Sequence, residues 1–233
     1  MKRLAAITLC AATAFGGTAS IVASFRSPCN PGNIYGIDYY DGSLYHADGI
    51  KGGYIYQTDT VGLIKARIRN ATGARGIDRT PSEFWTCNYD AWVYRLSTAG
   101  NILTSFKAWE PGYGVALGED CLWYTQGPVV YKVTLTGSLQ RWFKAPSTSA
   151  AGIYWAASYL WIADSINYYI YCVAESGKTI DSFRALARPY GVTWDGSYIW
   201  YTTMTTPYWV YKAKVNFTSI APASLGRVKA LYR

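Results

Sequence analysis

The sequence predicts an all-β protein: a five-bladed β-propeller whose blades are four-stranded antiparallel sheets. Three observations predict this fold. A glycine recurs every 38 to 40 residues, aromatic and β-branched pairs recur at fixed places between these glycines, and turn-forming residues separate the pairs. Four short strands in about 40 residues make one propeller blade. A single blade cannot bury both of its faces, whereas five blades in a ring bury each face against a neighbour.

The first strand of each blade is marked by a glycine followed by a β-branched residue. Successive pairs are 40, 38, 38 and 39 residues apart. β-Branched residues favour strands, so each pair is expected in an inner strand beside the propeller axis. The pairs are Gly36-Ile37, Gly76-Ile77, Gly114-Val115, Gly152-Ile153 and Gly191-Val192.

The next two strands are each marked by an apolar residue followed by an aromatic one. The second-strand pairs are Leu44-Tyr45, Phe84-Trp85, Leu122-Trp123, Leu160-Trp161 and Ile199-Trp200. The third-strand pairs are Ile55-Tyr56, Val93-Tyr94, Val130-Tyr131, Ile170-Tyr171 and Val210-Tyr211. Large aromatic side chains suit the wedge between two blades.

The fourth strand follows the third-strand tyrosine by 12 residues in four repeats, after a turn glycine. Its marker residues are Ile68, Phe106, Phe143 and Phe183. In the last repeat the same spacing reaches Ala223, in a stretch that makes a poor strand. The segment "SIVASFRSP", residues 20–28, instead matches "NILTSFKAW". We therefore expect the N-terminal segment to supply the outer strand of blade five and close the ring; the alternative is the segment 226–233.

The ends of the chain differ from the repeats. Residues 1–20 have a basic start, a short apolar run and small residues, which is the layout of a secretory signal peptide with cleavage after Ala14 or Ser20. The apolar run is shorter than the ~20 residues of a membrane span. The sequence thus predicts a secreted or cell-surface protein, with the propeller at 21–216 and an extension at 217–233 that packs on or flanks the last blade.

The charge and the cysteine and histidine content limit which partners and metals are expected. The formal net charge is +8, but only 15% of residues are charged and the basic ones are scattered, so no nucleic-acid surface is expected. A preference for acidic glycans or an anionic cell surface remains open. Beyond the leader the cysteines are Cys29, Cys87, Cys121 and Cys172, whose irregular positions leave three pairings open. With one histidine, His46, and no CxxC pair, zinc is not expected.

A candidate ligand site lies just before the repeated glycines, where loops of all blades meet near the axis. Three tyrosines and an arginine there could stack on a sugar ring or hold an anion. The alternative is that these side chains only pack the loops. The candidates are Tyr35, Arg75, Tyr113 and Tyr190, and the fifth position is Ala151.

Two carboxylates are weak metal candidates. Asp38 and Asp78 stand two residues after the glycines of adjacent inner strands, and paired carboxylates suit calcium or acid–base work. The other three equivalent positions lack a ligand of that kind, so no cofactor is assigned. His46 has no evident Ser or Cys partner, so we interpret it as a packed or surface residue and assign no catalytic residue.

The repeat resembles secreted propellers with NHL, YVTN or streptogramin-lyase-type repeats. The stretch "LWIADSINYYIY", residues 160–171, carries the resemblance best, and the repeats span about residues 21–212. The resemblance implies a propeller but not one activity, since such folds host many functions. Lyases of this type use a histidine and a glutamate with magnesium, a pattern from which a chain with one histidine departs. Five-bladed plant-type glutaminyl cyclases share no motif with it residue by residue.

These observations favour a secreted, non-catalytic propeller that binds a glycan or a protein through its loop-rich face. Two alternatives stay open. One is an extracellular structural subunit that self-assembles into filaments or a surface layer, since low charge and abundant tyrosine suit close lateral packing. The other is an enzyme of the lyase, lactonase or cyclase kind.

Overall fold

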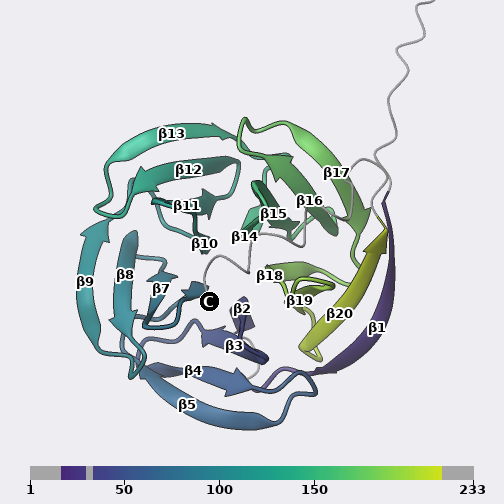
Figure 1. Cartoon of the computed structure of the whole chain (residues 1–233), viewed down its shortest axis with the longest axis horizontal. Helices are drawn as coiled ribbons and strands as arrows, with labels where there is room; N and C mark the ends of the chain where they lie inside the picture. The colour runs from purple at the N-terminus through teal and green to yellow at the C-terminus, as the bar shows by residue number, and fades with distance from the viewer. Residues whose placement is uncertain (1–16, 30–33, 217–233) are drawn as a thin grey trace, which may run out of the picture.

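The computed structural model describes residues 17–29 and 34–216, which form twenty strands in five antiparallel four-stranded sheets. The sheets stand as blades around one axis, and the ring is closed (Figure 1). The prediction of an all-β, five-bladed propeller is confirmed. Within the described residues there is no helix able to cross a membrane.

Each blade runs outward from an inner strand at the axis. Blade one has β2 (Ile34–Tyr40), β3 (Ser43–Asp48), β4 (Gly53–Thr58) and β5 (Ile64–Asn70). Blade two has β6 (Gly76–Arg79), β7 (Glu83–Cys87), β8 (Trp92–Ser97) and β9 (Ile102–Lys107). Blade three has β10 (Gly114–Leu117), β11 (Cys121–Gln126), β12 (Val129–Thr134) and β13 (Leu139–Lys144). Blade four has β14 (Ala150–Ala156), β15 (Tyr159–Asp164), β16 (Tyr169–Ala174) and β17 (Thr179–Arg184). Blade five has β18 (Pro189–Trp194), β19 (Ile199–Thr203), β20 (Trp209–Asn216) and β1 (Thr18–Arg26).

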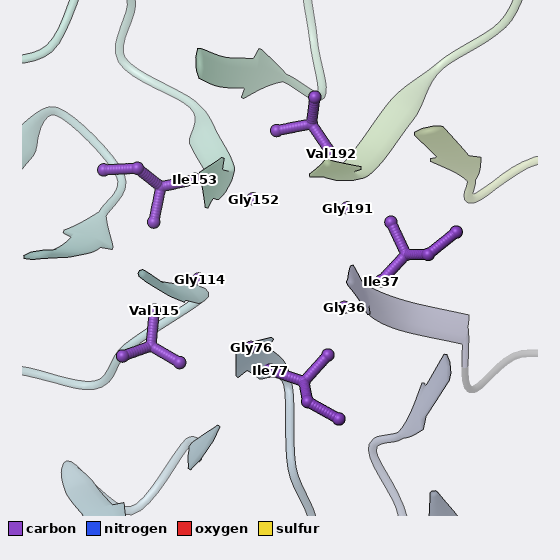
Figure 2. A pocket seen from close by; sticks show the side chains of 10 residues that line it. All are labelled: Gly36, Ile37, Gly76, Ile77, Gly114, Val115, Gly152, Ile153, Gly191 and Val192. Atoms are coloured by element: carbon purple, nitrogen blue, oxygen red, sulfur yellow. The ribbon is translucent and has the colours of Figure 1, made fainter. Parts of the chain in front are cut away.

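The five repeated glycines bring the inner strands together at the axis. A Cβ on Gly152 would lie 2.3 Å from the carbonyl oxygen of Tyr190, and one on Gly76 would lie 2.5 Å from the amide nitrogen of Val115. The branched side chains that follow the glycines point away from the axis, into the spaces between blades (Figure 2). The space left at the axis is about 10 Å³, close to the least that holds one water molecule.

Six apolar clusters are buried in the described part of the ring, and five of them each fill the space between a different pair of adjacent blades. Trp161 and Phe183 of blade four, for example, pack with Val192 and Tyr201 of blade five. Trp123 of blade three likewise packs with Ile153 and Leu160 of blade four. The second-strand aromatic thus buries its ring against the next blade, as the repeat predicts.

The closing strand is β1, as the N-terminal match predicts. It pairs antiparallel with β20, with Phe25 opposite Val210. The equivalent pairs elsewhere are Phe106 opposite Val93 and Phe183 opposite Ile170. Figure 1 shows β1 as the outermost strand beside β20. Phe25 therefore fills the fourth-strand position that the last repeat lacks.

The predicted boundaries fall only partly within the described residues. Residues 1–16 of the predicted leader, 1–20, lie outside the described residues. Its last three residues, Thr18, Ala19 and Ser20, belong to β1. Gly17 donates its N–H to the carbonyl oxygen of Ser182 at 2.9 Å. The extension at 217–233, with the alternative closing segment 226–233, lies outside the described residues.

Candidate functional site

The residues singled out before the repeated glycines lie on one face of the ring. That face, here called the loop face, carries the loops that enter the inner strands and the loops between second and third strands. Tyr35 and Tyr190 lie within β2 and β18, while Arg75 and Tyr113 directly precede β6 and β10. Four blades thus each send one of these side chains to the mouth of the axis.

Arg75 is the centre of this group. Its guanidinium carbon lies 4.7 Å from the ring centroid of Tyr35 and 5.5 Å from that of Tyr113. It also lies 4.6 Å from the ring of Tyr89, a residue that is 61% exposed in the loop between β7 and β8. Cation–π attraction holds a guanidinium at such distances. We call Tyr35, Arg75, Tyr89, Tyr113 and Tyr190 the Arg75 cluster.

Tyr190 completes the cluster from blade five, which is adjacent to blade one. Its ring meets that of Tyr35 edge-on, with centroids 5.1 Å apart. The side chain is only 5% exposed, and its buried hydroxyl has no hydrogen-bond partner within residues 17–29 and 34–216. Burial raises the pKa of this hydroxyl above its usual range, and the positive charge of Arg75 acts against that rise. Tyr190 therefore stays a neutral donor at physiological pH.

The charge of Arg75 is not neutralised by a neighbouring acid. Among the salt bridges of residues 17–29 and 34–216, none involves Arg75. Its side chain is half-buried, so the charge is neither fully hydrated nor paired. A half-buried cation beside an unpartnered hydroxyl is a ready site for an anionic or strongly accepting group. The structure thus brings all four predicted residues together and adds Tyr89.

Asp38 and Asp78 lie in the body of the ring, where they join blades. Asp38 Oδ2 accepts the backbone N–H of Arg79 in blade two at 3.0 Å, and its Oδ1 accepts the hydroxyl of Thr193 in blade five at 2.9 Å. Asp78 Oδ2 accepts the N–H of Leu117 in blade three at 2.9 Å. No group of three or more His, Cys, Asp or Glu side chains suited to a metal occurs in the described part.

The remaining reactive side chains are buried in the sheets. His46 is fully buried, with its Nε2 2.9 Å from the hydroxyl of Thr58, and burial lowers its pKa to about 3. It is a packed residue, one of the two predicted alternatives. The cysteines of the described residues are buried and free, and burial raises their thiol pKa values. Buried thiols of this kind are inert.

A larger groove lies on the opposite face, between blades two and three. Its volume is about 470 Å³. Glu83, in its wall, accepts the indole N–H of Trp85 at 3.0 Å and forms an ion pair with Arg95. Glu83 and Arg95, two charged residues that line the groove, are thus paired with each other, in contrast to Arg75.

Comparisons with known proteins bear on the fold. No protein-family model and no curated protein matches the sequence. Among solved structures, glutaminyl cyclase of Myxococcus xanthus superposes with a TM-score of 0.74 at 11% identity, over 88% of this chain and 99% of that one. Virginiamycin B lyase of Staphylococcus aureus gives 0.53 at 16% identity, over 89% and 91%. A nidogen/laminin complex gives 0.54 at 15% identity, over 70% and 69%. At these identities the likeness shows the propeller fold alone.

Proposed function

We propose that this protein is a secreted, non-catalytic propeller that binds a glycan or protein partner through the Arg75 cluster on its loop face. The observation that carries the proposal is the guanidinium of Arg75, which lies among three tyrosine rings and forms no salt bridge with any described residue. The hydroxyl of Tyr190 is buried without a partner among the described residues, so a ligand reaches this second donor once side chains at the mouth move. Together they suit a ligand with one carboxylate, sulfate or strongly polar oxygen next to a flat apolar face.

The body of the ring supports binding over catalysis. Asp38 and Asp78, the carboxylates nearest to the axis by sequence position, accept hydrogen bonds that tie neighbouring blades together. A carboxylate held by backbone N–H groups has a structural role that competes with proton transfer. The glycine ring also leaves about 10 Å³ at the axis, too little for a substrate to enter. A ligand would therefore rest on the mouth.

The proposal is tested by screening the protein on glycan and protein arrays. Arg75→Gln removes the charge and Tyr190→Phe removes only the hydroxyl, which avoids the cavity that an alanine would leave. Lys51→Gln is the matched control, because Lys51 is an exposed cation of the same loop face. Binding that survives both cluster changes would exclude the Arg75 cluster as the site.

Export is tested separately. The leader-like residues 1–20 support secretion. Expression of the full chain in a host with a secretory pathway should place the processed protein outside the cytoplasm. Retention of the uncleaved chain in the cytoplasm would contradict the secreted part of the proposal and leave the binding part intact.

A further inference from the structure

A second feature repeats around the rim of the ring, outside the Arg75 cluster. In all five blades a basic residue directly follows the fourth-strand apolar marker. These pairs are Phe25-Arg26, Ile68-Arg69, Phe106-Lys107, Phe143-Lys144 and Phe183-Arg184. Since side chains alternate along a strand, the apolar member points into the blade interface and the basic member points to the opposite side. All five basic residues are exposed.

The strand register places each cation directly opposite one residue of the third strand. In four blades that residue is a half-buried aromatic, and directly opposed residues share one face of the sheet. These four rim pairs are Tyr54 with Arg69, Trp92 with Lys107, Tyr169 with Arg184, and Trp209 with Arg26. In blade three Lys144 lies opposite Val129 instead of an aromatic residue. Two residues further along the third strand, Tyr131 lies opposite Trp142, and Trp142 is 55% exposed.

A second aromatic side chain extends each of the four rim pairs. It lies two residues further along the third strand, on the same face. The pairs of rings are Tyr54 and Tyr56, Trp92 and Tyr94, Tyr169 and Tyr171, and Trp209 and Tyr211, with centroids 5.9, 6.2, 5.8 and 6.3 Å apart. In these four blades the rim cation therefore stands at the end of a short aromatic row.

The rim cations have no acidic partners. In the part of the chain that the structure describes, none of the five takes part in a salt bridge. Third strands start and fourth strands end beside the loop face, so the rim pairs surround that face. In four blades an exposed cation beside an aromatic row suits one acidic sugar: the cation pairs with the carboxylate and a ring takes the apolar face of the sugar.

We propose that the rim pairs form a multivalent surface for an acidic polysaccharide. The observation that favours a glycan over nucleic acid is the pairing of a cation with an aromatic row in four separate blades, instead of one gathered basic patch. Each contact is weak because it is exposed. A polymer that reaches several blades at once gains avidity from their number. The surface acts independently of the Arg75 cluster.

The test compares two double variants that each remove two exposed cations from blades one and four. Arg69→Gln with Arg184→Gln removes rim cations, whereas Lys65→Gln with Lys178→Gln removes cations near the opposite face of the same blades. The probe is polygalacturonate, with neutral galactan as its uncharged counterpart. The loss of each rim cation should weaken binding about threefold, hence about tenfold for the rim variant, with little change for the control variant.

A separate variant tests the contribution of the aromatic residues to polygalacturonate binding. Tyr169→Leu keeps apolar bulk but removes the ring, and should weaken polygalacturonate binding severalfold without changing the salt dependence. Equal losses in the two double variants would show a mere net-charge effect and overturn the proposal. So would binding to duplex DNA or to phosphatidylserine vesicles as tight as to polygalacturonate. The rim double variant should cause the same loss in an Arg75→Gln background, which separates the rim from the Arg75 cluster.

Discussion

The carboxylate of Asp38 in blade one accepts the hydroxyl of Thr193 in blade five at 2.9 Å. The same threonine oxygen accepts the backbone N–H of Tyr39 at 3.1 Å, and Asp38 also accepts the N–H of Arg79 in blade two. First and last blades are thus joined near the axis by buried polar bonds, and at the periphery by the β1–β20 ladder. The ring is therefore closed by contacts both near the axis and at the periphery.

Thr193→Val should destabilise the protein by about 1–3 kcal/mol. The change keeps the volume of the side chain but removes the hydroxyl that donates to Asp38 and accepts from Tyr39, and buried groups that lose a partner cost about this much. Urea unfolding followed by tryptophan fluorescence measures the difference. Thr104→Val, at an exposed position in β9, is the control and should change stability by less than about 0.5 kcal/mol. Equal effects of the two changes would refute the inter-blade role.

Gly152→Ala should be more damaging than an ordinary glycine replacement. The new Cβ would lie 2.3 Å from the carbonyl oxygen of Tyr190, so blades four and five must separate at the axis. We expect a loss of about 2–4 kcal/mol, similar to other severe packing faults. Gly42→Ala is the comparison: it has open space but a φ of 72°, which costs about 1 kcal/mol. A milder effect at Gly152 than at Gly42 would contradict the close packing of the inner strands.

His46 should make the fold sensitive to acid. Its pKa is about 3 in the folded protein and near 6.5 when unfolded, so the folded state holds the neutral ring. The stability that depends on this neutral ring is complete above pH 6.5 and is lost as the pH falls towards 3. The loss approaches about 1.4 kcal/mol per pH unit and totals about 5 kcal/mol. Urea titrations between pH 7 and 4 should show this slope in the natural protein.

His46→Leu should remove that part of the pH dependence, although it lowers stability at pH 7 because the hydroxyl of Thr58 loses its partner. Acidic side chains contribute equally to both proteins, so the difference between the two curves isolates His46. Parallel curves would show that the buried histidine is not the acid-sensitive group.

Deletion of residues 18–26 should open the ring. β20 would lose its outer neighbour, and Val210 and Trp200 would lose the cover of Phe25. The truncated protein should melt at a lower temperature, and a peptide "TASIVASFR" should bind it and restore part of the loss. The same peptide with serine at the position of Phe25 should restore less. Unchanged melting after the deletion, with no response to either peptide, would mean that β1 does not hold the ring closed.

The repeat made the fold predictable because each blade obeys the same constraints. The glycines are required by the close approach of backbones at the axis, and the second-strand aromatics by the wedge between blades, so both recur with the period of the blade. The closing strand was found for the same reason: Phe25 matches the fourth-strand marker although it stands at the other end of the sequence.

The site was predictable only where it follows that period. Tyr35, Arg75, Tyr113 and Tyr190 share one position relative to the repeated glycine, so the ring necessarily brings them together. Tyr89 was not predicted because the equivalent loop position of the other blades is not aromatic: it holds Gly49, Gly127, Ser165 and Met204. The hydrogen bond from Leu117 to Asp78 was also hidden, since the two residues are 39 positions apart and only the assembled blades join them.

The central claim is that the Arg75 cluster binds a ligand through both the positive charge and the planar shape of the Arg75 guanidinium group. Isothermal titration of the tightest ligand from the arrays tests it most directly, with Arg75→Lys, Arg75→Gln and Lys51→Gln as variants. We predict that Arg75→Gln weakens binding at least about tenfold, that Arg75→Lys recovers only part of it because the ammonium group lacks the planar fork, and that Lys51→Gln binds normally. Equal affinity of the natural protein and Arg75→Gln would contradict the account.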